Sequence, residues 1–128
     1  MKVVDSSIWL EHLTSGPLAE LAAAELVDPR AVLVPTLVLL EVYKFVLRVS
    51  GEDAADQVLA RMMCSPIQPL PPLLAVRAAR MCLEHRLATA DAIIFAHAED
   101  AGLPLVTCDA HFEGLPGVEY HSKSSRRS

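Results

Sequence analysis

The chain has 128 residues, of which 52% are hydrophobic and only 5% aromatic, which predicts one domain with an aliphatic core and argues against a disordered protein. Its formal net charge of −5 excludes a protein that holds nucleic acid by bulk positive charge alone, but not one that uses metal ions or a local basic cluster. The three cysteines form no C-x-x-C pair, which argues against a disulfide framework or a thiolate zinc site and favours a reduced, cytoplasmic compartment.

The N-terminus and the apolar runs predict no contact with a membrane. One lysine followed by an acid at position 5 does not make a signal peptide. The longest apolar run, residues 31–40, is interrupted by Pro35 and Thr36, and a membrane span needs roughly 20 apolar residues. We therefore expect a soluble protein.

Short apolar runs alternate with helical patterns along the chain. Gly51 suits the C-terminus of the apolar helix that precedes it, and Thr89 suits the N-cap of the helix that follows it. In chain order, the predicted elements are a strand at 2–5, helices at 6–13 and 17–27, a strand at 31–34, helices at 36–50 and 52–63, a strand at 67–70, helices at 72–86 and 89–101, and strands at 104–107 and 118–120.

Strands of about four residues that alternate with helices are typical of parallel βα units. We therefore predict the α/β class, with a short parallel sheet of four to five strands between two layers of helices, which is a three-layer α/β/α sandwich. Residues 1–121 should form this single domain. The tail at 122–128 contains only Ser, Lys and Arg, and we expect it to be disordered.

Two aspartates directly follow predicted strands. Asp5 comes after the first strand, and Asp109 comes after the strand that contains Thr107. If these strands are parallel, both carboxylates emerge at the carboxyl edge of the sheet, where open α/β sheets bind their ligands. Taken alone, either aspartate could instead cap a helix or a turn, and the two roles can coexist.

Two further acids lie on apolar helix faces. Apolar residues surround Glu41, so we expect it to be at least half buried, with either a metal ion or Lys44 as its partner. Asp91 shares a face with Ile94 and Phe95, which should turn it toward the sheet, although an acid in a first helical turn can also serve only the helix dipole. Carboxylates repel each other unless a cation lies among them, and hard ions such as Mg²⁺ or Mn²⁺ favour oxygen ligands. The four acids together predict a metal site.

Several other polar residues are candidates for supporting roles. The candidates are the hydroxyls of Ser6, Ser7 and Thr107 for orienting a metal ligand or a water, His111 for touching a phosphate, and Arg77 and Arg80 for guiding a polyanion toward the acids. For the two arginines the alternative is ordinary ion pairing. The chain contains neither an H-E-x-x-H motif nor the glycine-rich loops of common nucleotide-binding sites.

Four short motifs together resemble those of the PIN-domain family, specifically of the ribonuclease toxins of VapBC-type toxin–antitoxin pairs. The motifs are residues 4–9 with Asp5, 35–43 with Glu41, 89–94 with Asp91, and 105–112 with Asp109. Each motif is loose, but the set in this order and spacing is specific. The resemblance covers nearly all of residues 1–121.

The resemblance implies a parallel sheet in the order 3-2-1-4-5 and an endoribonuclease that depends on Mg²⁺ (or Mn²⁺) held by the four acids. It also implies a homodimer, a cognate antitoxin whose C-terminal segment covers the acids, and structured RNA substrates such as tRNA or ribosomal RNA. In one respect the chain departs from the family. Some relatives carry a further acid on the loop of the fourth motif, whereas His111 stands two residues after Asp109 here. We therefore expect one ion to bind firmly and a second to bind only with substrate.

The predicted reaction is hydrolysis of RNA phosphodiesters by metal-activated water, without a side-chain nucleophile. The resemblance implies a 5′-phosphate product. A receiver or phosphotransfer domain would also gather acids at a sheet edge. Such a domain needs paired acids after the first strand and a lysine at a late strand end, and the chain has neither. A non-catalytic PIN-like module that binds RNA or protein is the remaining alternative, and the presence of all four acids argues against it.

Overall fold

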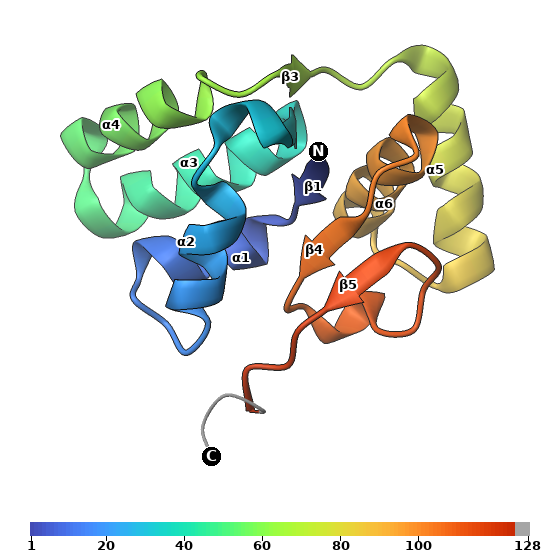
Figure 1. Cartoon of the computed structure of the whole chain (residues 1–128). Helices are drawn as coiled ribbons and strands as arrows, with labels where there is room; N and C mark the ends of the chain where they lie inside the picture. Colours follow the sequence, from blue (N-terminus) through green and yellow to red (C-terminus); the bar gives the residue numbers. More distant parts are fainter. Residues whose placement is uncertain (125–128) are drawn as a thin grey trace.

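The computed structural model describes residues 1–124, which form a five-stranded sheet with helices packed around it (Figure 1). The strand order is β3-β2-β1-β4-β5, and every neighbouring pair is parallel. The strands are β1 (Lys2–Val4), β2 (Val32–Pro35), β3 (Ile67–Gln68), β4 (Leu105–Thr107) and β5 (Val118–Tyr120). The predicted α/β class and the order 3-2-1-4-5 are confirmed.

Right-handed connections decide which face of the sheet each helix covers. The chain steps from β1 to β2 to β3 in one direction, and it returns from β3 to β4 through α5 and α6. The helices before the return therefore cover one face and the last two helices cover the other, and Figure 1 shows the two groups on opposite sides of β1. The helices are α1 (Ser6–Leu13), α2 (Ala19–Leu26), α3 (Thr36–Ser50), α4 (Glu52–Met62), α5 (Pro72–His85) and α6 (Thr89–Ala101), with 3₁₀ turns η1 (Pro29–Ala31) and η2 (Ala110–Phe112).

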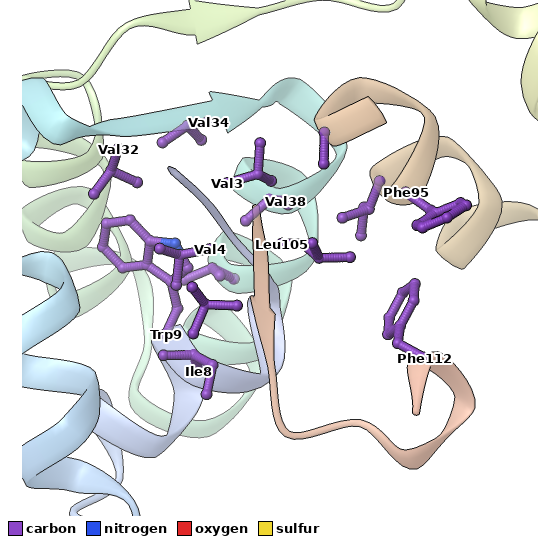
Figure 2. Close-up of a cluster of buried hydrophobic side chains, with 14 of the residues drawn as sticks. Val3, Val4, Ile8, Trp9, Val32, Val34, Val38, Phe95, Leu105 and Phe112 are labelled. Atoms are coloured by element: carbon purple, nitrogen blue, oxygen red, sulfur yellow. The ribbon is translucent and has the colours of Figure 1, made fainter. Parts of the chain in front are cut away.

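The core lies between the sheet and its helices and is mainly aliphatic (Figure 2). β1 contributes Val3 and Val4, and β4 contributes Leu105 and Val106, all of which are almost completely buried. Strands buried on both faces appear in a sequence as continuous apolar runs rather than as an alternating pattern. Phe112 in η2 is also fully buried, so the turn that follows β4 is anchored to the core.

Most predicted boundaries lie within one residue of those in the structure, and three differences are notable. β3 covers only two residues rather than 67–70, because Pro69 has no N–H with which to continue the ladder. The helix predicted at 17–27 begins two residues later, at Ala19. Thr89 is the first residue of α6 rather than its N-cap. Ala88 holds the cap position with an extended backbone and no side-chain hydrogen bond, so the prediction for Thr89 was wrong.

The structure also shows the end of α3 and the first residues of the predicted C-terminal tail. Gly51 follows α3 as predicted, with a φ of 89° that would strain a residue with a side chain. Within the segment predicted as a tail, Lys123 lies 3.6 Å from the buried carboxylate of Glu11, and residues 125–128 lie outside the described part of the chain. Over residues 1–124, no helix combines the length and the apolar character that crossing a membrane requires.

Candidate functional site

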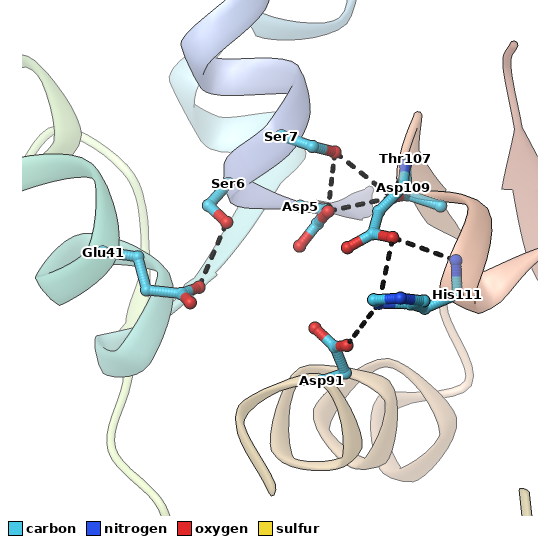
Figure 3. A network of polar contacts seen from close by, with 8 residues as sticks. All are labelled: Asp5, Ser6, Ser7, Glu41, Asp91, Thr107, Asp109 and His111. Carbon is cyan, nitrogen blue, oxygen red and sulfur yellow. Dashed lines mark hydrogen bonds and ion pairs between the residues drawn. The ribbon is translucent and has the colours of Figure 1, made fainter. Parts of the chain in front are cut away.

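The register of the sheet brings together the ends of β1 and β4, which carry Asp5 and Asp109. The backbone N–H of Asp5 donates a 2.9 Å hydrogen bond to the carbonyl of Val106, so the residue after β1 lies beside the end of β4. Because neighbouring parallel strands end at one edge of the sheet, Asp5, Thr107 and Asp109 all emerge there. Figure 3 shows the polar side chains that gather at this edge.

Asp5 is the most deeply buried acid of the group, with only 3% of its surface exposed. Its Oδ2 accepts a 2.6 Å hydrogen bond from the Ser7 hydroxyl and a 2.8 Å hydrogen bond from the Thr107 hydroxyl. A carboxylate that accepts two hydroxyl hydrogen bonds is fixed in orientation, because any rotation of its side chain would break at least one of them. Asp5 occupies the N-cap position of α1, but its side chain forms no capping hydrogen bond there.

The same two hydroxyls also fix the chain that follows β4. The Ser7 Oγ accepts a 3.1 Å hydrogen bond from the backbone N–H of Cys108, and the Thr107 Oγ1 accepts a 3.0 Å hydrogen bond from the backbone N–H of Asp109. Each hydroxyl thus donates to Asp5 and accepts from the backbone of the β4 loop. The position of the Asp109 backbone is therefore tied to the orientation of the Asp5 carboxylate.

Glu41 reaches the site from α3. It is half buried, as predicted, and its Oε1 accepts a 3.1 Å hydrogen bond from the Ser6 hydroxyl (Figure 3). Burial raises the pKa of Glu41, and the charges of Asp5 and Asp91 raise it further, whereas the hydrogen bond from Ser6 and the charge of Lys44 lower it. Ser6 rather than Lys44 is therefore the direct partner of this carboxylate.

Asp91 and Asp109 meet at the start of α6, where an imidazole lies between them. Asp91 lies in the first turn of α6 and keeps 18% of its side chain exposed. Asp109 precedes η2, and its Oδ1 accepts a 2.9 Å hydrogen bond from the backbone N–H of His111. The His111 Nδ1 lies 3.3 Å from Asp109 Oδ1 and 3.4 Å from Asp91 Oδ2. These three side chains can offer ligand atoms that all lie within 4.8 Å of one another.

Burial and the charges of neighbouring acids raise the pKa values of three of the acids. Burial raises the pKa of Asp5 and the charge of Asp109 raises it further, although the hydrogen bonds from Ser7 and Thr107 act in the opposite direction. Burial and the charge of Asp109 likewise raise the pKa of Asp91, whereas His111 lowers it. Together with the effects on Glu41, each of these shifts marks an energetic cost of bringing negative charges together in a partly buried place.

A divalent cation fits this group of residues. The donors are carboxylate oxygens, with hydroxyl and backbone groups behind them, and Figure 3 shows all four carboxylates facing one region between β1, α3, α6 and the β4 loop. A cation there would offset both the burial, which is the main cause of the raised pKa values of three of the acids, and their mutual repulsion. Hard ions such as Mg²⁺ take this kind of oxygen shell, with several waters completing it.

The two predicted basic residues lie elsewhere. Arg77 on α5 contacts Glu99 at 2.7 Å and Asp100 at 3.5 Å, both in the last turns of α6. Asp91 lies in the first turn of the same helix, about 12 Å away along the helix axis at 1.5 Å per residue. Arg80 is exposed on α5. The structure does not bring either arginine to the acids, and their contact with RNA stays a prediction.

The contact between His111 and Asp91 is absent from the sequence-based prediction. The spacing of His111 from Asp109 is visible in the sequence, but Asp91 lies twenty positions away, and only the packing of α6 beside η2 brings the two side chains together. The roles of the Cys108 and Asp109 backbone N–H groups were also missed, because backbone donors leave no trace in the residue type. The local signal for this network is a pair of hydroxyl residues next to strand ends, which does indicate Ser7 and Thr107.

Comparison with known proteins agrees with this geometry. The model of the PIN domain family matches residues 2–118. No curated protein matches the chain at a significant level.

Several solved structures share the fold. One is a toxin–antitoxin complex from Klebsiella pneumoniae, with 21% identity, a TM-score of 0.82, and coverage of 95% of this chain and 99% of that chain. Another is Mycobacterium tuberculosis VapC20, described as a sarcin-ricin-loop-cleaving toxin, with 22% identity, a TM-score of 0.79, and coverage of 94% and 99%. A third is DNA-bound VapBC from Salmonella typhimurium, with 15% identity, a TM-score of 0.72, and coverage of 96% and 99%.

Proposed function

The chain belongs to the PIN-domain family, and we propose that it is a metal-dependent endoribonuclease that acts as the toxin of a toxin–antitoxin pair. The observation that carries this proposal is the convergence of four carboxylates from separate segments of the chain at the carboxyl edge of the sheet. A domain that served only as a binding module would not need to keep several mutually repelling acids in a partly buried place.

The chain's own residues divide the work of the site. Asp5, Glu41, Asp91 and Asp109 would hold Mg²⁺ or Mn²⁺ next to the scissile phosphodiester. When bound, the divalent ion supplies a water of lowered pKa and positive charge for the attacked phosphate.

The hydroxyls act on the carboxylates rather than on the substrate. Ser7 and Thr107 hold Asp5 in one orientation, and Ser6 holds Glu41. This arrangement pre-sets the ligand shell, so little rearrangement is needed when the ion and the RNA bind. No serine, threonine or cysteine is needed as a nucleophile in this reaction. By similarity to the PIN-domain family, we expect product fragments with 5′-phosphate ends.

An antitoxin protein is the proposed regulatory partner. Toxin–antitoxin complexes from Klebsiella pneumoniae and Salmonella typhimurium share this fold, which supports a partner of that kind. An antitoxin segment that covers the acids would compete directly with RNA for the same edge of the sheet. Because VapC20 is described as a toxin that cleaves the sarcin-ricin loop, ribosomal RNA belongs among the substrates to be tested, together with tRNA.

A homodimer is the proposed assembly. Leu73, Val76 and Leu83 lie on one face of α5 at helical spacing, and Leu73 and Leu83 are 84% and 86% exposed. Leu40 and Leu47 on α3 are also exposed. Exposed apolar side chains in this number are typical of surfaces that pack against another protein. A second copy of the chain is the partner that we propose for the α5 face.

The test is cleavage of total RNA by the purified protein. Wild type is compared in Mg²⁺, in Mn²⁺ and in EDTA with the Asp5→Asn variant and with Asp53→Asn, a control that removes one exposed carboxylate from the first turn of α4. We expect discrete fragments with wild type and Asp53→Asn in either metal, and no fragments in EDTA or with Asp5→Asn. Fragment ends that carry 2′,3′-cyclic phosphate and form in EDTA would contradict the mechanism. Absence of both cleavage and metal binding would favour the non-catalytic module, whereas metal binding without cleavage would indicate a very narrow substrate or a retained inhibitor.

A further inference from the structure

The imidazole of His111 lies where a ligand of a metal ion would lie. Its Nδ1 is 3.3 Å from Asp109 Oδ1 and 3.4 Å from Asp91 Oδ2. Two atoms bound to the same ion at about 2.0 to 2.2 Å are about 2.9 to 3.5 Å apart in octahedral or tetrahedral geometry. His111 therefore already has the spacing from each aspartate that ligands of one ion have, and the donor atoms of all three side chains lie within 4.8 Å of one another.

The fold holds this imidazole near the acids even though its side chain is 73% exposed. The backbone N–H of His111 is bound to Asp109 Oδ1 at 2.9 Å, and the next residue, Phe112, is fully buried. The imidazole thus extends from a turn that is anchored on both sides. Asp91 approaches from α6, so the group combines two independent elements rather than one flexible loop.

We propose that His111 is a metal ligand, which rests on the proposed use of a divalent ion. Together, Asp91, Asp109 and His111 select a transition-metal ion such as Mn²⁺ over Mg²⁺. Mg²⁺ favours an all-oxygen shell of carboxylates and waters, whereas imidazole nitrogen is a ligand that first-row transition ions accept readily. A further carboxylate at this position would strengthen the binding of Mg²⁺. A nitrogen donor at the same position instead shifts the preference of the site toward transition-metal ions. Some relatives carry a further acid on this loop. In this chain, His111 supplies a ligand in place of that acid.

A competing account gives His111 a different role. A protonated imidazole between two carboxylates is itself a cation, and it could stand in for the metal ion and oppose its binding. The two accounts predict opposite results when the imidazole is removed. A ligand is lost in the first case, so affinity for Mn²⁺ falls. A competitor is lost in the second case, so affinity for both Mn²⁺ and Mg²⁺ rises.

The experiment measures metal binding directly, without RNA. Isothermal titration of Mn²⁺ and of Mg²⁺ is compared for wild type, His111→Ala, His111→Asp and His121→Ala. His121 follows β5 at the same edge of the sheet, where its backbone N–H is bound to the Thr107 carbonyl at 2.9 Å, so it controls for loss of a nearby imidazole. Pulsed electron paramagnetic resonance of bound Mn²⁺ then detects whether an imidazole ¹⁴N is coordinated.

We expect wild type and His121→Ala to show the ¹⁴N signal and to bind Mn²⁺ more tightly than Mg²⁺. His111→Ala should lose the signal and about tenfold or more in Mn²⁺ affinity, with a smaller loss for Mg²⁺. His111→Asp should strengthen Mg²⁺ binding and reduce the preference for Mn²⁺. A ¹⁴N signal that remains in His111→Ala, or tighter binding of both ions by that variant, overturns the proposal.

Failure of this inference can be distinguished from failure of the proposed function. If wild type cleaves RNA only in the presence of metal and Asp5→Asn cleaves no RNA, the proposed nuclease activity is supported. Absence of the ¹⁴N signal then counts only against His111 as a ligand. If wild type binds neither Mn²⁺ nor Mg²⁺, the inference and the metal-dependent mechanism both fall.

Discussion

Thr107 donates a 2.8 Å hydrogen bond to Asp5 across 102 positions of the sequence, and this contact joins the ends of β1 and β4. The same Thr107 hydroxyl accepts a hydrogen bond from the backbone N–H of Asp109. Thr107 is fully buried, so neither interaction can be replaced by water without a rearrangement. One hydroxyl group thus sets the relative position of two acids.

Thr107→Val should therefore disturb the positions of Asp5 and Asp109, even though the two side chains are nearly equal in size. The variant keeps the shape of the side chain but leaves the Asp109 N–H without its partner and Asp5 with one hydroxyl donor fewer. We expect the free energy of unfolding to fall by about 1 to 3 kcal/mol and RNA cleavage to fall strongly. Thr107→Ser keeps the hydroxyl and is the control, measured by urea denaturation and by cleavage rate. Equal losses in both variants would show that packing of the methyl group, rather than the hydroxyl, matters.

The metal-free protein should lose stability as the pH rises from mild acid. The pKa values of Asp5, Glu41 and Asp91 are raised in the folded state, chiefly by burial, above the value of about 4 expected in the unfolded chain. A raised folded-state pKa stabilises the protein fully below the unfolded pKa, and this contribution is lost as the pH rises through the folded pKa.

Asp5→Asn isolates that effect. Asparagine can still accept hydrogen bonds from Ser7 and Thr107, but it carries no charge to be buried. In EDTA, the stability of the variant relative to wild type should increase as the pH rises from about 4 toward neutral. Thermal melts of both proteins across this pH range measure the difference. A difference that stays constant with pH would mean that Asp5 titrates alike in the folded and unfolded states.

Added divalent metal should raise the melting temperature, and more so at neutral than at acid pH. Protons and the metal ion compete for the same carboxylates, and the raised pKa of Asp5, Glu41 and Asp91 extends this competition above the ordinary range of acids. The measurement is a thermal shift with Mg²⁺ or Mn²⁺ at about pH 5 and pH 7.5, with EDTA as the reference. Asp109→Asn should reduce the shift at both values, and an equal shift in that variant would place the ion elsewhere.

Leu83→Glu should convert a dimer to a monomer if the α5 face is the contact surface. A charge on this exposed residue costs little in the monomer, but within an apolar interface it would be buried without a partner. The matched control is Val27→Glu, because Val27 is 77% exposed but follows α2 rather than lying on α5. Sedimentation at micromolar concentration gives the mass of each protein. A monomeric wild type, or a dimeric Leu83→Glu, contradicts the proposed surface.

Gly16→Ala should destabilise the connection between α1 and α2. A Cβ at Gly16 would clash with the Glu11 carboxylate, which is buried and accepts a 2.9 Å hydrogen bond from the backbone N–H of Leu18. Displacing that carboxylate leaves a buried donor unsatisfied, and we expect a loss of about 1 to 3 kcal/mol in urea denaturation. On a Glu11→Ala background, the same glycine substitution should cost much less, because the clash is gone.

Features encoded by neighbouring residues can be predicted well from the sequence. An apolar run followed by an acid identifies the ends of β1 and β4, and the rule that parallel strands share a carboxyl edge is enough to place Asp5 and Asp109 together. Glu41 stands out because a carboxylate surrounded by apolar residues needs a partner. These inferences need only the local pattern and the general topology of parallel sheets.

Features that depend on how elements pack were not predicted. Arg77 joins Glu99 and Asp100 because α5 lies against α6, and nothing in the local sequence of either helix reveals this pairing. Thr89 has a good capping side chain, but α6 begins at Thr89 itself and Ala88 takes the cap position. The arginine pairing depends on contact between two helices, and the position of a helix end by one residue is not determined by one capping side chain of modest energy.

The hydrogen bond between Thr107 and Asp5 also has a consequence during synthesis of the protein. A nascent chain that has reached only residue 104 already contains Asp5, Glu41 and Asp91, but neither the Thr107 hydroxyl nor Asp109 exists yet. The edge of the sheet that carries these acids is incomplete in such a chain, because β4 has yet to pair with β1. Under the proposed function, a ribosome that makes this protein is exposed to its activity only after the last part of the domain has been added. The order of the segments along the chain thus delays the proposed activity until Thr107 and Asp109 have been synthesised.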